Sequence, residues 1–210
     1  MAIISKGYEG TVNYADWAVL TSHLGAQYSV FGPDAYAVSF GSGDREVLVA
    51  PGRAAGQGIL DDSDAPVSLV GATVGSGSRW DLIALRRDWT TSETIPVLVQ
   101  GASTAAIPAG REDSPGSQDD QPLALVRFAA GQTAPQEVID LRCWHGDGGM
   151  AAKSLLVRDY LTRIGTRVWV QGITWVLGFN ALGLPTWVPD SVYVGATAPP
   201  YSENLLWAKP

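Results

Sequence analysis

Residues 79–89 contain an unbroken apolar run, Leu82-Ile83-Ala84-Leu85, with charged and aromatic residues at both ends. Successive side chains of a strand point to opposite faces, so a strand with this run needs apolar cover on both sides. We therefore expect residues 82–85 to form a buried strand. We also expect Arg79 or Arg87 to pair with a nearby aspartate rather than with a substrate.

Two later segments, residues 122–128 and 138–142, repeat the pattern of apolar residues before an arginine. We interpret them as neighbours of the first strand at the centre of one β core. The 24 glycines and 13 prolines of the chain favour short strands joined by turns over long helices. The sequence therefore predicts an all-β fold, mainly antiparallel.

Residues 1–145 are predicted to form a sandwich-like N-terminal domain with one short helix over residues 13–24. Asn13 can cap this helix, and Gly25 ends it. The helix could dock a partner, but its length favours a role in covering one end of the sheet. Alternating apolar residues on both sides of Gly32-Pro33-Asp34 predict a β-hairpin at that turn.

A glycine-rich segment, residues 146–150, is predicted to be a linker to a small β module over residues 151–210. About 60 residues are near the lower limit for a self-sufficient core. The module is also rich in tryptophan, a residue common at interfaces. We therefore expect it to mediate oligomerisation or partner docking, with candidate interface residues Trp169, Trp175, Trp187 and Trp207.

The net charge of −7 argues against binding to nucleic acid or to anionic lipid, since both require a basic surface. The single cysteine, Cys143, excludes an intrachain disulfide. The first residues lack the pattern of a signal peptide, and we expect no membrane span. These features predict a protein that works without membrane or nucleic acid.

Two groups of residues could in principle bind a metal. Residues 61–64, Asp-Asp-Ser-Asp, lack the spacing of a calcium loop, so a solvated turn is the favoured interpretation. Cys143, His145 and Asp147 alternate and could share one face of a strand, but no second ligand pair accompanies them as in a zinc site. We predict no metal and no cofactor.

The sequence also gives little support for an enzymatic activity. The chain has two histidines, and no Gly-x-Ser-x-Gly motif supports a hydrolase triad. Acidic side chains have arginines close in sequence, which favours ionised, paired carboxylates over a catalytic acid. We therefore predict that the protein is not an enzyme. The candidate structural ion pairs involve Arg79, Asp81, Arg87, Asp120, Asp140 and Arg142.

Several short strings, taken in order over roughly residues 10–145, resemble minor tail or upper-baseplate proteins of tailed bacteriophages that infect actinobacteria. The strings are Asp16-Trp17-Ala18, Val49-Ala50-Pro51-Gly52-Arg53-Ala54, Gly56-Gln57-Gly58, Ser78-Arg79-Trp80-Asp81-Leu82-Ile83, Asp119-Asp120-Gln121-Pro122-Leu123-Ala124-Leu125-Val126 and Ile139-Asp140-Leu141-Arg142.

The resemblance implies a β-rich structural subunit near the tail tip of a virion, made in the host cytoplasm and commonly assembled as a trimer. Its partners would be copies of itself and other tail or baseplate proteins, and it would connect the tail to receptor-binding components. The alternative is a carbohydrate-binding module that recognises the host cell wall by stacking tryptophans on sugars. A third, less favoured alternative is a wall-polysaccharide hydrolase that uses Asp61, Asp62, Asp119 and Asp120.

Overall fold

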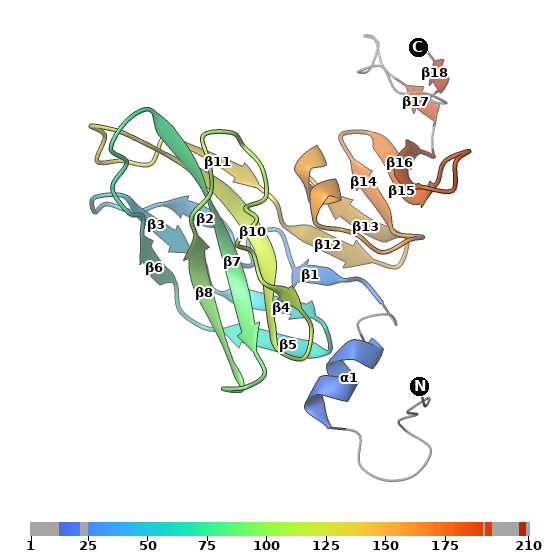
Figure 1. Ribbon diagram of the computed structural model, residues 1–210, viewed down its shortest axis with the longest axis horizontal. Coiled ribbons are helices and arrows are strands. Elements are labelled where there is room, and N and C mark those ends of the chain that lie inside the picture. The colour runs from blue at the N-terminus through green and yellow to red at the C-terminus, as the bar shows by residue number, and fades with distance from the viewer. Residues whose placement is uncertain (1–12, 22–24, 191, 195–205, 209–210) are drawn as a thin grey trace.

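The computed structural model describes residues 13–21, 25–190, 192–194 and 206–208, with side chains described up to residue 190. Strands make up 49% of the part of the chain that the structure describes and helices 7%, and most strand pairs are antiparallel. The predicted all-β, mainly antiparallel fold is therefore confirmed. Figure 1 shows the sheets, with the helix α1 (Tyr14–Thr21) at one end of them.

Two small antiparallel sheets form the first part of the chain. The first sheet has the order β1 (Tyr28–Phe31), β4 (Gly52–Gly56) and β5 (Ile59–Ser63), and the second has β2 (Val38–Phe40), β3 (Glu46–Val49) and β6 (Val67–Val70). β1 and β2 thus belong to different sheets. The predicted hairpin around Gly32 is wrong, because that turn passes the chain from one sheet to the next.

The central sheet contains the segments that the apolar runs single out. Its order is β11 (Glu137–Asp140), β10 (Gln118–Ala129), β7 (Ser78–Asp88) and β8 (Glu93–Val99), with the short β9 (Asp113–Ser114) beside β10. The residues at positions 82–85 are all buried, as predicted. The register of β10 against β7 shifts between Pro122 and Ala124. Proline has no N–H to donate, which suits such an irregularity.

β7 is buried on both sides because its two faces belong to different cores. Ile83 and Leu85 pack with residues of the first two sheets, such as Val30 and Val47. Leu82 and Ala84, which share the other face of β7, pack into a cluster that continues into the C-terminal part of the chain. The unbroken apolar run is therefore explained by cover from both sides.

The C-terminal sheet has five strands, β12 (Cys143–Gly146), β13 (Gly149–Ala152), β14 (Arg167–Val170), β15 (Ile173–Phe179) and β16 (Pro185–Pro189). β13 and β14 are parallel, and the 3-10 helix η1 (Leu155–Asp159) lies between them in the chain. The other neighbours are antiparallel. β17 (Val192–Val194) and β18 (Leu206–Ala208) form a separate parallel pair.

The predicted linker is a β-hairpin turn. Gly146 and Gly149 pair with each other at the end of the antiparallel strands β12 and β13. The core also crosses this point without a break, since Tyr28 and Leu82 share one cluster with Val157 and Val168. The boundary predicted at residues 146–150 is therefore wrong. Glycine there permits the turn, with φ at +116° for Gly149.

The helix α1 (Tyr14–Thr21) begins where the sequence predicts, and the Asn13 side chain accepts a hydrogen bond from the backbone N–H of Asp16. Residues 22–24 of the predicted helix lie outside the described residues. α1 rests close to the β4–β5 turn, because a Cβ on Gly58 would meet the Thr21 hydroxyl. Among the described residues no helix is long and apolar enough to cross a membrane.

Candidate functional site

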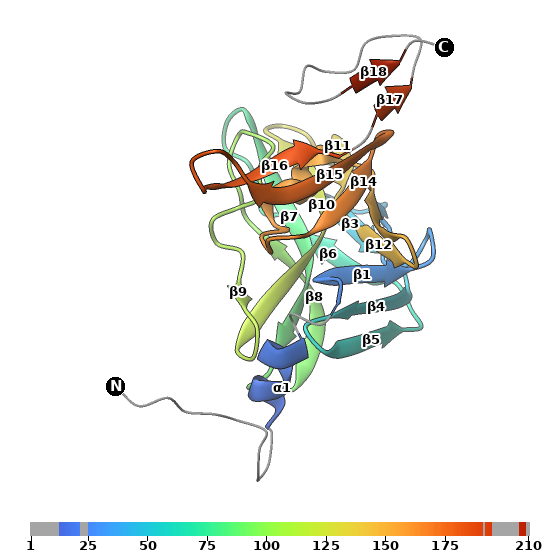
Figure 2. The same cartoon turned by 90° about the vertical axis from the view of Figure 1, so that its right-hand side faces the viewer.

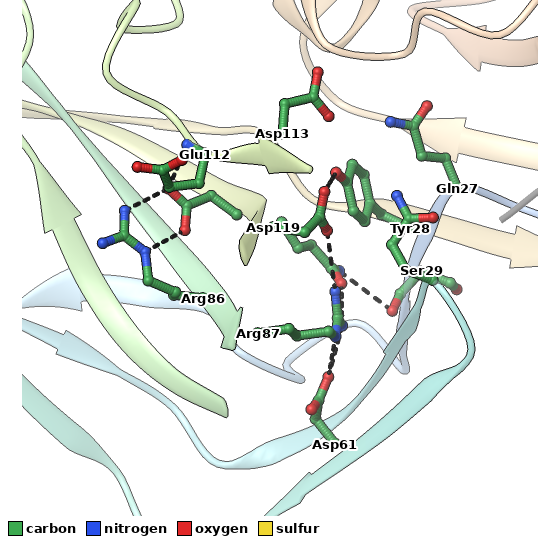
Figure 3. Close-up of polar contacts among 12 residues, drawn as sticks. Gln27, Tyr28, Ser29, Asp61, Arg86, Arg87, Glu112, Asp113 and Asp119 are labelled. Carbon is green, nitrogen blue, oxygen red and sulfur yellow. Dashed lines mark hydrogen bonds and ion pairs between the residues drawn. The ribbon is translucent and has the colours of Figure 1, made fainter. Parts of the chain in front are cut away.

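An ion pair between Arg87 of β7 and Asp61 of β5 lies at the centre of a buried polar cluster (Figure 3). Two guanidinium nitrogens donate to Asp61 Oδ2, Nε at 2.9 Å and Nη2 at 2.6 Å. Nη2 also donates to the Gln121 amide oxygen at 2.7 Å. A Cβ on Gly56 would lie 2.7 Å from Arg87 Nη1, so a glycine at this position leaves room for the guanidinium.

Asp119 on β10 occupies the other side of this cluster and is fully buried. Its Oδ1 accepts a 2.7 Å hydrogen bond from the Tyr28 hydroxyl, and its Oδ2 lies 3.9 Å from Arg87 Nη1. Burial raises the pKa of Asp119 to about 6, although Tyr28 and Arg87 oppose this shift. Burial and the nearby carboxylate also raise the pKa of Tyr28 far above its ordinary value.

Asp120 points away from Asp119, as successive strand residues do. It forms a bidentate pair with Arg86, with both nitrogen–oxygen distances at 2.8 Å, and accepts a hydrogen bond from the Glu112 backbone N–H at 3.0 Å. The Arg111 guanidinium donates to the Asp120 carbonyl at 2.8 Å. These bonds attach Arg111 and Glu112, which precede β9, to β10 of the central sheet.

Two further ion pairs lie at the strand ends. Arg79 forms a bidentate pair with Asp81, at 2.7 and 2.8 Å. Arg142 does the same with Asp140, at 2.9 and 2.7 Å. All six predicted ion-pair residues therefore take part in ion pairs, but Asp120 pairs with Arg86, and the partner of Arg87 is Asp61.

The four acids considered for a hydrolase do not form one open site. Asp61 and Asp119 are buried in the cluster around Arg87, and Asp120 is committed to Arg86. Asp62 is exposed and pairs with Arg53 at 2.8 Å. Because the carboxylate of Asp119 is fully buried, a dissolved polysaccharide has no access to the acid with the raised pKa.

Neither of the two residue groups that were considered as metal ligands comes together in the structure. Asp61 and Asp62 point to opposite sides of β5, one buried and one exposed. The Cys143 thiol is buried 3.0 Å from the Tyr160 hydroxyl, and burial raises its pKa to about 12, whereas His145 is exposed. Within the residues that the structure describes, no three His, Cys, Asp or Glu side chains are grouped to hold a metal.

Three buried polar atoms without a hydrogen-bond partner lie between the first sheet and the C-terminal sheet. They are Gln27 Oε1, Gln57 Nε2 and Arg163 Nη1. Two cavities of about 490 and 330 Å³ flank this region and share Gly25, Ala26 and His145 in their walls. Buried atoms of this kind usually bind ordered water. The region can therefore hold water or a small polar molecule.

The predicted interface tryptophans occupy different environments. Trp169 is 51% exposed, whereas Trp175 is 7% exposed and lies in the core, with the Arg158 guanidinium 4.2 Å from its ring centre. The expectation of a free interface at Trp175 is therefore wrong, because its side of β15 faces the core. Trp187 is half-buried and donates its indole N–H to the Arg158 carbonyl at 3.0 Å. The side chain of Trp207 lies outside the described residues.

Sequence reasoning missed Trp144, which lies on the same outer sheet face as Trp169. The register pairs Trp144 with Ala151, and Ala151 with Trp169. The pairing of β12 with β13 determines this position, and the assignment of a linker at residues 146–150 conceals that pairing.

Comparisons with family models, curated proteins and solved structures find no match to this chain. Its function must therefore be inferred from the structure and sequence of this chain alone. The relevant features are a buried ionic cluster, exposed apolar side chains on α1 and on the β15–β16 hairpin, and the tryptophans of the C-terminal sheet.

Proposed function

We propose that the protein is a structural subunit of a phage tail tip or baseplate that assembles as an oligomer, with a trimer as the expected form. In this role it connects the tail to receptor-binding components, and its function comes from its interfaces. The sequence resemblance over roughly residues 10–145 suggests the role. One structural observation carries it: large apolar side chains are exposed on two separate elements.

The first exposed apolar surface is α1. Tyr14 is 60% exposed, and Trp17 and Leu20 are also more than half exposed. The only buried residue of this helix is Ala18. A helix that merely covered a sheet would turn its large apolar residues inward. This helix leaves them accessible, which favours the docking role over the covering role.

The second exposed apolar surface is the β15–β16 hairpin, where Phe179, Leu182 and Leu184 are exposed. In both views this hairpin lies far from α1 (Figures 1 and 2). Burial of one such side chain contributes roughly 1.5–3 kcal/mol. Two apolar surfaces on separate elements suit a subunit that contacts different neighbours.

Light scattering after size exclusion, at micromolar concentration, tests the proposal. We expect a mass three times the 22.2 kDa of one chain. The double variants Trp17→Ser/Leu20→Ser and Leu182→Ser/Leu184→Ser should show which surface holds the oligomer together. Leu60→Ser, which changes another exposed leucine, on β5, is the control. A wild-type chain that stays monomeric at every concentration would count against the trimer.

The position in the particle needs a separate experiment. Gold-labelled antibodies against this chain, imaged on assembled particles, should label the end of the tail. Labelling of the capsid, or no labelling of intact particles, would contradict the proposed role.

A further inference from the structure

The outer face of the C-terminal sheet carries a trough between two tryptophans. Trp144 on β12, Ala151 on β13 and Trp169 on β14 are consecutive partners across the sheet. Their sequence neighbours, such as Cys143 and Val168, face the core. Two strand spacings separate the tryptophans by about 10 Å at the backbone. The small Ala151 between them forms the floor.

Contacts within the protein fix the orientation of the Trp144 ring. Its indole N–H donates to the Gly32 carbonyl at 2.8 Å, and the Arg142 guanidinium lies 5.0 Å from the ring centre. Arg142 is itself buried and held by Asp140. Such support lowers the entropy that a binding side chain loses when a ligand is bound.

The trough has a volume of about 350 Å³ and is lined almost entirely by apolar groups: Gly32, Pro33, Trp144, Ala151, Ala152, Lys153 and Trp169. Lys153 is its one charged side chain, with its ammonium 5.2 Å from the Trp144 ring centre. An aromatic trough with a single cation at its edge is complementary to a ligand with apolar flat faces and a negative charge.

Lys153 can still bind an anion. Its ammonium lies 3.1 Å from Asp140 Oδ2 and its side chain is exposed. An ammonium has three N–H donors, so two remain for a ligand. Asp140 is meanwhile neutralised by its bidentate pair with Arg142. A carboxylate of a bound molecule can therefore pair with Lys153 without displacing Asp140.

We propose that this trough binds an acidic glycan, with sugar rings packed on Trp144 and Trp169 and a sugar carboxylate paired with Lys153. The C–H groups on one face of a pyranose ring pack well against the negative face of an indole. A linear glycan also presents equivalent faces at regular intervals, as the two tryptophans require. This binding function goes beyond the proposed structural role and does not depend on it.

A proline-rich peptide is the competing ligand for an aromatic groove. Such a peptide needs hydrogen-bond donors for its backbone carbonyls. The indole N–H of Trp144 is already donated to Gly32, and Lys153 is the one charged donor in the trough. A sugar carboxylate can pair with Lys153, whereas the backbone of a proline-rich peptide carries no anion, so the lining favours the acidic glycan.

Calorimetry with two matched oligosaccharides tests the proposal. The first is a tetrasaccharide of alternating N-acetylglucosamine and N-acetylmuramic acid, which carries carboxylates, and the second is neutral chitotetraose. We expect the acidic sugar to bind several-fold more tightly. Trp169→Ala should weaken both at least tenfold, and Lys153→Gln should remove the preference for the acidic sugar.

The control is Phe40→Ala, since Phe40 is 46% exposed, close to the 51% of Trp169, but lies on β2. This variant should leave the affinity unchanged. Circular dichroism melts establish that every variant folds. The proposal is overturned if neither sugar binds, if Phe40→Ala loses as much affinity as Trp169→Ala, or if a proline-rich decapeptide binds in their place. The oligomeric state, measured on the same samples, reports separately on the structural role.

Discussion

Arg87 and Asp61 join two different sheets through one ion pair, with Arg87 on the central sheet and Asp61 on the first sheet. Arg87 is 1% exposed, so water contributes little to the solvation of its charge. A buried pair of this kind contributes little net stability compared with apolar residues, but the loss of one partner is costly. The pair therefore specifies how the two sheets align.

Arg87→Leu should lower the free energy of unfolding by about 3–5 kcal/mol, because it leaves Asp61 charged and unpaired in the core. The double variant Arg87→Leu/Asp61→Leu should recover much of this loss. Urea denaturation measures both. Arg53→Leu breaks the exposed pair with Asp62 and should cost no more than about 1 kcal/mol. Equal losses for the buried and exposed pairs would contradict the assigned role.

Asp119→Asn should change how stability depends on pH. The pKa of Asp119 is about 6 in the folded protein, whereas an unfolded aspartate titrates near pH 3.9. Between these values the folded state binds more protons, so this group lowers the free energy of unfolding as the pH rises. Above pH 6 its full cost, roughly 2–3 kcal/mol, is present.

Asparagine cannot ionise, yet its amide oxygen can still accept from the Tyr28 hydroxyl. The stability difference between Asp119→Asn and the wild type should therefore shift in favour of the variant as the pH rises from about 4 to 7. Urea denaturation at several pH values measures this difference. If the stability difference between the variant and the wild type stayed constant over this pH range, Asp119 would titrate normally.

Gly58→Ala should displace α1 from the β4–β5 turn. The new Cβ would lie 2.3 Å from the Thr21 hydroxyl oxygen and 3.2 Å from the Trp17 ring, at a φ of +80°. Gly131→Ala is the matched control, because Gly131 has a φ of +71° with no atom within 4 Å of the added Cβ. Backbone strain is common to both, at roughly 1–2 kcal/mol.

The loss of stability in Gly58→Ala should therefore exceed that in Gly131→Ala, and the tryptophan emission of the protein should shift only in the former. Thermal unfolding and emission spectra provide the two measurements. Identical losses would mean that α1 does not rest on this turn.

Tyr160→Phe should destabilise the core by about 1–3 kcal/mol. The Tyr160 hydroxyl is buried and donates to the Leu141 carbonyl at 2.6 Å, so its removal leaves that carbonyl without this donor. Tyr14→Phe changes a 60% exposed tyrosine and should have little effect. Chemical denaturation of both variants provides the comparison. A Tyr160→Phe variant as stable as the wild type would contradict the role of this bond.

The sequence allowed prediction of the features that depend on neighbours along the chain. The apolar run of β7 requires cover on both faces, and the pairs Arg79–Asp81 and Asp140–Arg142 join residues two positions apart. The partner of Arg87 depends on how two sheets stack, which no local pattern encodes. The burial of Trp175 likewise follows from which face of β15 meets the core.

The wrong prediction of a linker at residues 146–150 also has a physical cause. Glycine-rich composition suits a flexible linker and a tight hairpin turn equally well. The distinction depends on whether the flanking residues find strand partners, and here β13 pairs with β14 as well as with β12. The Trp144 trough could not be predicted without that pairing.

The continuous core also has consequences for the kinetics of folding. The Gln27 side chain donates to the Tyr160 carbonyl, 133 residues away in the chain, and the rings of Tyr28 and Tyr160 lie 5.9 Å apart. Contacts between such distant residues close large loops, which makes folding slow. On a ribosome, the N-terminal sheets must wait for most of the chain to emerge before their core is complete. We expect nascent chains that stop before residue 160 to expose the Leu82 side of β7 and to need chaperones.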